Sequence, residues 1–318
     1  MALQSSSSLH PTTNKFHVCL PAMAGVATRV AQLVNLKHPS TLRIRQRHSL
    51  QQAFQAHSRR SLSLPPKDAR AGVAFALDIS FVEAPLVKKE LAAEQIYSLV
   101  LDISSNPSLM KGHTAAGQYV QLRVPGTDAK PAYISIASPP RTATSGSLEF
   151  LIKYVEGSTA GYLCNLKKGD KVEVSPVGGS GFPIDRLYPA EDFPTVLIFA
   201  TGTGISPVRS LIEAGFDAIK RSDVRLYYGT RSLRWMAYQE KFKEWEASGI
   251  RVIPVLSQSD GDWEGEAGYV QAAFQKEKGI TDPLRTGAIL AGQREMMEDV
   301  TSHLLAEGVL KEKIIKNF

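Results

Sequence analysis

The strongest constraint on the fold is a strand–turn–helix signal that follows residue 194. Val196–Phe199 is an apolar run typical of a buried parallel strand, and Gly202 and Gly204 follow it closely. Pro207 then opens a helical pattern that ends at Gly215. This geometry directs backbone N–H groups and the positive end of a helix toward an anion, so it predicts a nucleotide-binding turn. A glycine turn that serves only chain reversal is the alternative.

Two parts of the chain differ in the rhythm of their apolar segments. Residues 73–183 hold short β-branched segments separated by turn residues, which predicts a six-stranded antiparallel Greek-key β-barrel. The expected strands are 76–82, 95–103, 119–124, 133–137, 148–155 and 170–174, with one helix at 160–166. Residues 190–318 alternate strand and helix, which predicts an α/β domain with a doubly wound parallel sheet. The expected strands are 195–200, 224–228, 251–256, 288–291 and 313–316, and the expected helices are 207–219, 236–247, 270–276 and 294–307. Pro254 predicts a bulge or an edge position in its strand.

The N-terminal 66 residues differ in charge from the rest of the chain. They contain eight Lys and Arg residues and no Asp or Glu, and they are rich in Ser, Thr and Ala. This composition predicts a transit peptide, and the Met-Ala start favours the chloroplast stroma over the mitochondrion. Cleavage is expected between residues 55 and 72. The alternative is a basic arm for nucleic acid, but the whole chain carries only +6, so residues 67–318 carry a net −2 and favour no nucleic-acid partner.

Cysteine content and hydropathy exclude two other classes of protein. Cys19 and Cys164 are the only cysteines, whereas an iron–sulfur cluster needs four thiolates. Any iron–sulfur partner would therefore be a separate protein, and Cys164 is expected to be a small buried residue. No apolar run has the length of a membrane span. No metal site is expected, because His113 and His303 have no ligand spacing.

An ordered series of short motifs resembles the ferredoxin–NADP⁺ reductase superfamily, especially its short bacterial-type and plastid members. The motifs are Gly117–Val120, Tyr133–Pro140, Gly157–Gly161, Gly169–Val172, Pro176–Gly179, Gly202–Pro207, Tyr228–Arg231, Gly268–Gln271 and Ala291–Gly292. The likeness covers residues 73–318. It implies an FAD-binding barrel at 73–183 and an NAD(P)-binding α/β domain at 190–318. The implied cofactors are FAD and NADP(H), with NAD(H) possible.

The resemblance assigns the flavin site to two segments of the barrel. Ser135 matches the family serine that faces flavin N5, and Tyr133 and Ile134 precede it. Ala132 and Ile134 replace the family's arginine and tyrosine, so stacking on the flavin would be aliphatic. Tyr133 is expected on the opposite strand face from Ile134. The helix start formed by Gly157, Ser158, Thr159 and Ala160 would hold the flavin diphosphate, with Lys130, Lys153 or backbone donors in place of the missing arginine.

The resemblance assigns the nicotinamide nucleotide to four segments of the α/β domain. The phosphate turn comprises Gly202, Thr203, Gly204, Ile205 and Pro207. Ala291 and Gly292 would face the nicotinamide, with alanine where the family often has cysteine, and Tyr269 would stack on adenine. Ser257, with either Arg231 or Arg234, would read a 2′-phosphate, because Gln258 and Ala267 replace two family cations. A solvated surface role for both arginines remains open.

The last residue, Phe318, would shield the flavin or nicotinamide, or else cap the core.

Two functions are compatible with these residues. The first is an FAD-dependent oxidoreductase that passes hydride and electrons between NAD(P)H and a ferredoxin-like protein, quinone or dye. The second is a non-catalytic flavin- or nucleotide-binding regulatory or assembly protein, favoured by the replaced family residues. Flavin bleaching by NADPH distinguishes them. The sequence leaves open the acceptor, the oligomeric state and the efficiency of ferredoxin turnover.

Overall fold

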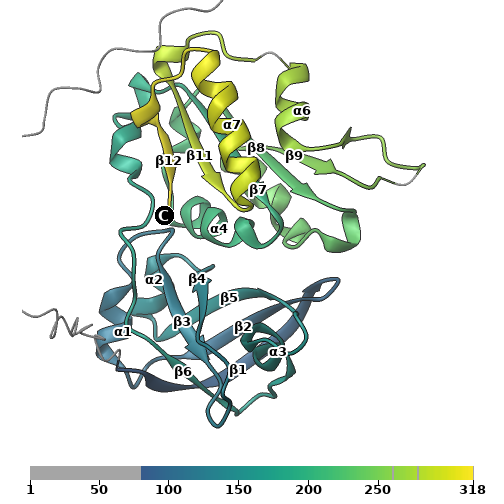
Figure 1. Cartoon of the computed structure of the whole chain (residues 1–318). Helices are drawn as coiled ribbons and strands as arrows, with labels where there is room; N and C mark the ends of the chain where they lie inside the picture. Colours follow the sequence, from purple (N-terminus) through teal and green to yellow (C-terminus); the bar gives the residue numbers. More distant parts are fainter. Residues whose placement is uncertain (1–79, 260, 278, 318) are drawn as a thin grey trace, which may run out of the picture. The chain divides into compact units, whose positions relative to one another are not determined.

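The computed structural model describes residues 80–259, 261–277 and 279–317. Residues 82–174 form a closed antiparallel sheet (Figure 1). Its strands are β1 (Val82–Ala93), β2 (Ile96–Asp102), β3 (Tyr119–Arg123), β4 (Ala132–Ser135), β5 (Ser147–Lys153) and β6 (Lys171–Val174). They are ordered β4-β3-β6-β1-β2-β5, and a bridge between Ile136 and Phe150 joins the two ends of the sheet. The predicted six-stranded barrel is confirmed.

The first strand differs from its predicted position. The strand predicted at 76–82 is wrong in its described part, because β1 begins only at Val82 and continues to Ala93. The run of charged residues and alanines in this segment has low β propensity, which concealed the strand. Pairing overrides that propensity: Val82–Pro85 pairs with β6, and the strand pairs with β2 from Leu86 onward. Ala84 and Leu86 are completely buried in the barrel.

Three short helices accompany the barrel. They are α1 (Pro107–Gly112), α2 (Pro140–Thr144) and α3 (Thr159–Asn165). Of these, only α3 was predicted. Cys164 lies in α3 with 3% exposure, and burial raises the pKa of its thiol to about 11, so it is the small buried residue expected. Cys19 and the predicted transit peptide at 1–66 lie outside the described residues.

The second part of the chain forms the predicted parallel sheet. Its strands are β7 (Thr195–Thr201), β8 (Asp223–Thr230), β9 (Arg251–Leu256), β10 (Glu266–Ala267), β11 (Thr286–Ala291) and β12 (Ile314–Lys316), in the order β10-β9-β8-β7-β11-β12. All neighbouring pairs are parallel. Because β11 returns to the other side of β7, the strand order reverses between these two strands, as in a doubly wound sheet.

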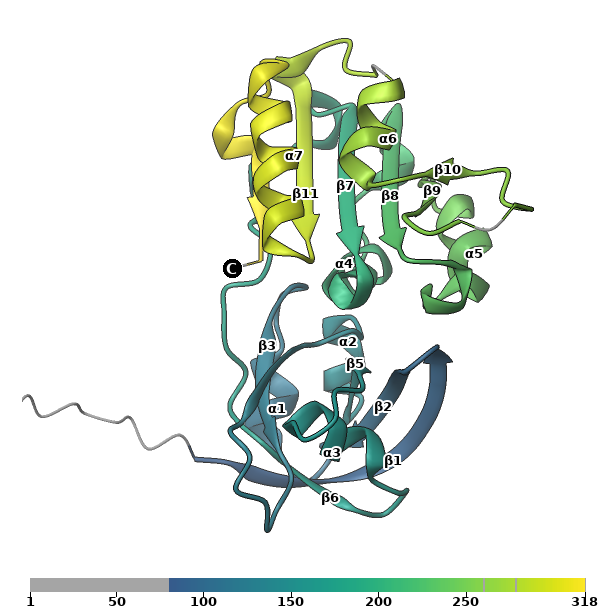
Figure 2. The same ribbon diagram turned by 45° about the vertical axis from the view of Figure 1, so that its right-hand side comes forward.

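Helices cover both faces of this sheet. They are α4 (Ile205–Ala214), α5 (Phe242–Ala247), α6 (Val270–Glu277) and α7 (Arg294–Ala306). Successive side chains of β7 point to opposite faces of the sheet. Ile198 packs in a cluster with α4 and α5, whereas Phe199 packs with α6 and α7. Figure 2 shows α6 and α7 side by side over one face.

Some boundaries of the α/β domain differ from prediction. The helix predicted at 207–219 ends at Ala214, because Gly215 has a φ of +87° and stops it. The helix predicted at 236–247 begins only at Phe242, after a 3-10 turn. Pro254 pairs regularly with Tyr228, and β10 reaches only the next two residues, so Pro254 lies at an edge. The edge prediction is confirmed.

The barrel and the α/β part make direct contacts within one compact unit. The Glu94 N–H in the β1–β2 hairpin donates to the Arg234 carbonyl at 2.7 Å. The Ser210 hydroxyl of α4 donates to the Ser138 carbonyl at 2.8 Å. The predicted domain limits, 73–183 and 190–318, stay a prediction. In the described ranges, no helix has both the length and the apolar composition of a membrane span.

Candidate functional site

A cavity of about 970 Å³ lies where the barrel meets the carboxyl ends of β7 and β11. Open α/β sheets bind ligands at this reversal of strand order. The barrel contributes Ile96, Tyr133, Ile134, Ser135, Leu151 and Lys153 to the lining. The α/β part contributes Gly202, Thr203, Gly204, Pro207, Arg231, Ser257, Tyr269, Ala291 and Gly292. The fold therefore brings most of the predicted site residues from both parts to one place.

The glycine turn after β7 is open toward this cavity. Gly202 has a φ of +53°, and a Cβ added there would meet nothing within 4 Å. A Cβ on Gly204 would lie 2.5 Å from the Gly292 Cα, so the turns after β7 and β11 touch and both residues must stay small. The Ser206 side chain, at the start of α4, is buried without a hydrogen-bond partner among the described residues. An open backbone turn at a helix N-terminus fits the phosphate of a dinucleotide.

One residue of the predicted phosphate turn lies outside the cavity. Ile205 is completely buried and packs in the core cluster with Val208 and Ile198. Its side chain anchors the turn to the hydrophobic core, whereas Thr203 and Pro207 line the cavity.

The outer face of β4 forms part of the barrel side of the cavity. Ser135 pairs with Tyr119 and Tyr133 pairs with Gln121, so Tyr133 and Ser135 share one face. Ile134 points the other way and packs against the barrel core, as the register argument predicted. Tyr133 is 68% exposed, and its ring lies edge-on to Tyr119 at 5.6 Å. The cavity thus offers a tyrosine ring beside Ser135, and Ile134 borders it while its side chain packs toward the barrel core.

The predicted diphosphate segment lies away from this cavity. Gly157, Ser158, Thr159 and Ala160 stand at the start of α3, and none of them is among the lining residues. The Ser158 hydroxyl accepts from the Gly161 N–H at 3.2 Å, and the Thr159 hydroxyl donates to the Lys130 carbonyl at 2.6 Å. Lys130 lines a separate hollow of about 500 Å³. Their flavin role stays a prediction, and Lys153 is the lysine that reaches the main cavity.

The loops that follow the carboxyl ends of β8 and β9 are joined by backbone hydrogen bonds. The Ser257 N–H donates to the Thr230 carbonyl at 3.0 Å, and the Gln258 N–H donates to the Arg231 carbonyl at 2.7 Å. Tyr269, 67% exposed, lines the cavity with these residues. The predicted residues Arg231, Ser257 and Tyr269 therefore all line the same cavity.

Sequence reasoning missed several residues of the lining, including Trp235, Glu295, Asp299 and Asn317. Trp235 comes from a 3-10 turn, Glu295 and Asp299 from α7, and Asn317 follows β12. Asp299 accepts a hydrogen bond from the Gln271 amide at 3.2 Å. None of these residues belongs to a motif, so only the tertiary fold reveals them. Phe318, predicted to shield the rings, lies outside the described residues.

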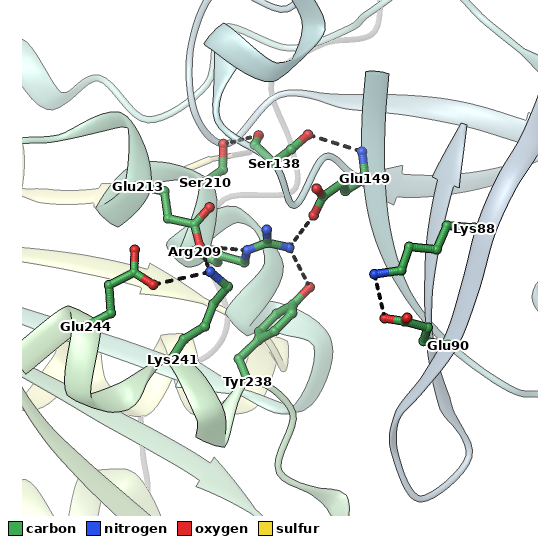
Figure 3. Close-up of polar contacts among 10 residues, drawn as sticks. All are labelled: Lys88, Glu90, Ser138, Glu149, Arg209, Ser210, Glu213, Tyr238, Lys241 and Glu244. Carbon is green, nitrogen blue, oxygen red and sulfur yellow. Dashed lines mark hydrogen bonds and ion pairs between the residues drawn. The ribbon is translucent and has the colours of Figure 1, made fainter. Parts of the chain in front are cut away.

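A charge network joins the barrel to α4 through the buried side chain of Arg209 (Figure 3). The Arg209 guanidinium contacts Glu149 of β5 at 2.6 Å and Glu213 of its own helix at 2.9 Å. It also lies 4.9 Å from the centre of the Tyr238 ring. Burial alone would lower the pKa of Arg209, but these partners outweigh it and raise the pKa. Arg209 therefore stays charged and links the two parts of the unit.

Comparisons with known proteins agree with this geometry. Residues 198–302 match the family model for the oxidoreductase NAD-binding domain. The chain is 49% identical over 229 residues to fruit protein pKIWI502 of Actinidia deliciosa, covering 70% of this chain and 72% of that protein. It is 34% identical over 163 residues to ferredoxin–NADP reductase B of Sorangium cellulosum, covering 49% of this chain and 63% of the reductase.

A solved structure shows the same fold. The ferredoxin–NADP⁺ reductase of Neisseria gonorrhoeae, solved with bound FAD and NADP, aligns with a TM-score of 0.59 at 18% identity. The alignment covers 72% of this chain and 92% of that one. With the two-part fold, the glycine turn and the shared cavity, these matches show that the chain belongs to the ferredoxin–NADP⁺ reductase superfamily.

Proposed function

We propose that this protein is an FAD-dependent oxidoreductase that passes electrons from NAD(P)H to a separate acceptor. The single observation that carries the proposal is the cavity. Tyr133 and Ser135 of β4 line it together with the glycine turns that follow β7 and β11. A flavin held beside Tyr133 and Ser135 and a nicotinamide held by the two glycine turns would meet in this cavity. Such positioning supplies most of the rate in hydride transfer.

FAD, when bound, supplies a ring that takes a hydride and releases electrons one or two at a time. The chain's own residues bind, orient and exclude water. Gly202 leaves open space at the turn after β7, Gly204 and Gly292 let the two turns pack against each other, and the small Ala291 lies beside them. Ile96 and Leu151, 2% and 3% exposed, form an apolar part of the wall that keeps water out. Ser135 offers a hydroxyl on the cavity face of β4.

NADPH is the proposed electron donor, and NADH is the alternative. Arg231 brings a cation to the loop pair that contains Ser257, and Tyr269 supplies a ring for adenine. A 2′-phosphate is a dianion that arginine binds well. Both Glu295 and Asp299 come from α7, whereas Arg231 follows β8, so carboxylates and this cation enter the cavity from different elements.

The proposed acceptor is a separate ferredoxin-like protein or a small molecule such as a quinone or dye. Curated relatives include the reductase component DmpP of a phenol 2-monooxygenase, of which this chain covers 44%. Since residues 67–318 carry a net −2, electrostatic steering toward an acidic ferredoxin is weak. We therefore expect dye and quinone reduction to be fast relative to ferredoxin reduction.

The test is an anaerobic titration of the purified protein with NADPH and with NADH, followed by flavin absorbance. Bleaching, and recovery of the oxidised spectrum when an acceptor is added, supports the proposal. A protein that stays colourless after FAD is added contradicts it. A protein that binds FAD but is not bleached by either nucleotide supports the non-catalytic binding function, which Ala132 in the family's arginine position favours.

We further propose that the protein acts in the chloroplast stroma. The acid-free leader supports this location, and so do a plant relative and a cyanelle ferredoxin–NADP reductase from Cyanophora paradoxa, 29% identical over 154 residues. Import of the full chain, but not of residues 73–318, into isolated chloroplasts would be the expected result.

A further inference from the structure

Asn317 places a polar side chain in the wall of the cavity where no motif predicts one. The residue is 3% exposed and lines the cavity directly after β12. Its amide nitrogen donates to the Gly117 carbonyl at 3.3 Å. Because a carbonyl only accepts, this contact fixes the amide with its nitrogen toward Gly117 and its oxygen turned away. The oxygen, Oδ1, is buried and has no hydrogen-bond partner among the described residues.

An unpartnered acceptor of this kind needs an explanation, since buried polar atoms are nearly always paired. Two other lining residues, Ser206 and Gln271, also carry a buried polar atom that has no partner in the described ranges. Both stand in motifs that the resemblance assigns to the nicotinamide nucleotide. Asn317 stands in no such motif, so the role of its acceptor is still unassigned.

The strand register puts Asn317 beside the turn that follows β11. Lys316 of β12 pairs with Leu290 of β11, and the two strands are parallel. The next residues along these strands, Asn317 and Ala291, are therefore at the same level, and both line the cavity. Asn317 is thus the neighbour of the turn proposed to face the nicotinamide.

The hydrogen bond to Gly117 holds the same side chain against the barrel. A Cβ on Gly117 would lie 3.0 Å from the Asn317 Cβ, so the two residues are closely packed. Gln118 follows Gly117, and its carbonyl accepts from the Ile136 N–H at 3.0 Å, one residue after Ser135. Asn317 therefore lies between the β11 turn and the Ser135 end of β4, with its amide fixed from the barrel side.

We propose that Asn317 Oδ1 accepts a hydrogen bond from an N–H group of one of the two rings that meet in this cavity. The inference rests on the proposed function, which brings those rings together. An amide oxygen is a neutral acceptor, so it pairs with an N–H and not with a phosphate, a ring carbonyl or an unprotonated ring nitrogen. Because Gly117 already fixes the amide, little side-chain entropy is lost when the ring binds.

Two ring groups have this chemistry. The carboxamide of the nicotinamide carries an N–H in both oxidation states, and the level of Ala291 favours it. The flavin gains an N–H at N5 only on reduction, and the attachment of Asn317 to the barrel favours that source. In the second case Asn317 would stabilise the reduced ring over the oxidised one.

The experiment compares Asn317→Leu and Asn317→Ala with the wild type, in full-length protein loaded with FAD. Leucine keeps the approximate size of the side chain and alanine does not, whereas both lack the acceptor. The matched control is Asn165→Leu, which replaces an exposed asparagine at the end of α3. The readouts are the two-electron midpoint potential of the flavin and calorimetric Kd values for three ligands. These are NADP⁺, its 3-acetylpyridine analogue, which has a methyl group in place of the carboxamide NH₂, and 2′,5′-ADP, which has no nicotinamide.

A nicotinamide contact predicts that wild type binds NADP⁺ about three- to tenfold more tightly than the acetylpyridine analogue. Both Asn317 variants should lose this preference, while the control keeps it and the Kd for 2′,5′-ADP stays unchanged. A flavin contact predicts the same preference in all proteins. It also predicts a three- to tenfold loss of affinity for the reduced ring relative to the oxidised ring in both Asn317 variants, which lowers the midpoint potential by about 15–30 mV.

The inference is overturned if both Asn317 variants keep the wild-type ligand preference and the wild-type potential. It is also overturned if the variants lose 2′,5′-ADP affinity as strongly as NADP⁺ affinity, or if Asn165→Leu causes the same changes, because the effect would then be one of packing. When NADPH bleaches the wild-type flavin, such results refute this inference alone. A wild type that binds neither FAD nor NADP⁺ refutes the proposed function and this inference together.

Discussion

Replacement of Arg209 by methionine should weaken the junction between the barrel and α4. Methionine keeps most of the aliphatic length but leaves Glu149 and Glu213 without their shared cation. At an effective dielectric constant of about 20, contacts of 2.6 and 2.9 Å correspond to about 6 kcal/mol each. Desolvation of several kcal/mol per ion offsets much of that gain. Removing one partner of such a buried set still costs about 3–5 kcal/mol, because carboxylates stay behind uncompensated.

The two carboxylates should contribute unequally. The Glu213 side chain is 9% exposed and keeps a second cation, Lys241, at 3.0 Å, whereas Glu149 is 25% exposed. A second substitution, Glu149→Gln, should therefore restore part of the stability that Arg209→Met removes. Since Glu149 belongs to β5 and Arg209 to α4, this coupling measures the contact between barrel and α/β part directly.

The assay is urea unfolding followed by far-UV circular dichroism, with the free energy taken by linear extrapolation. The control is Arg294→Met, which breaks another helical arginine–glutamate pair four residues apart, Arg294–Glu298 at 2.7 Å, but on the surface. Solvent screens that pair, so the control should keep the wild-type midpoint. The reasoning is refuted if Arg209→Met unfolds at the same urea concentration as Arg294→Met.

Three further predictions concern the turn, a buried histidine and the barrel serine. Gly204→Ala should abolish nucleotide binding in a fluorescence titration, because its Cβ would lie 2.5 Å from the Gly292 Cα; wild-type affinity would show that the two turns do not touch. Burial lowers the pKa of His113 to about 4 from 6.5, so the unfolded chain binds the proton first and stability should fall by about 3 kcal/mol as the pH drops from 6.5 to 4. His113→Gln should remove that slope in urea midpoints measured across this range, and an unchanged slope would assign it to other groups. Ser135→Ala should slow flavin reduction in stopped-flow by about 10- to 100-fold with little change in nucleotide Kd, and an unchanged rate would exclude a role at the reacting rings.

The sequence predicted the elements whose local pattern agreed with their tertiary setting. The apolar run at Val196–Phe199 and the glycine at 202 identify β7 and its turn without reference to any other segment. The same holds for Gly215 as the end of α4. By contrast, β1 has charged residues and alanines along its length and is a strand only because β2 and β6 pair with it.

The site was predictable only where a motif marks it. Gly202, Gly204, Tyr269 and Gly292 belong to motifs, and the fold brings them together. Trp235 and Asn317 have no motif, because their place in the cavity depends on contacts between segments far apart in the chain. Arg209 follows the phosphate turn directly, yet nothing local indicates that its partner is Glu149 in the barrel.

The largest hydrophobic cluster does not respect the boundary between barrel and parallel sheet. Ile96 and Leu151 of the barrel are buried in one cluster with Ile198, Leu211 and Trp245. Ala92 and Ala93 of the β1–β2 hairpin pack against it from the barrel side. A protease or denaturant that opens one half would expose apolar surface of the other, so residues 80–317 should melt in a single calorimetric transition. Neither half should be recoverable as a stable fragment after limited digestion.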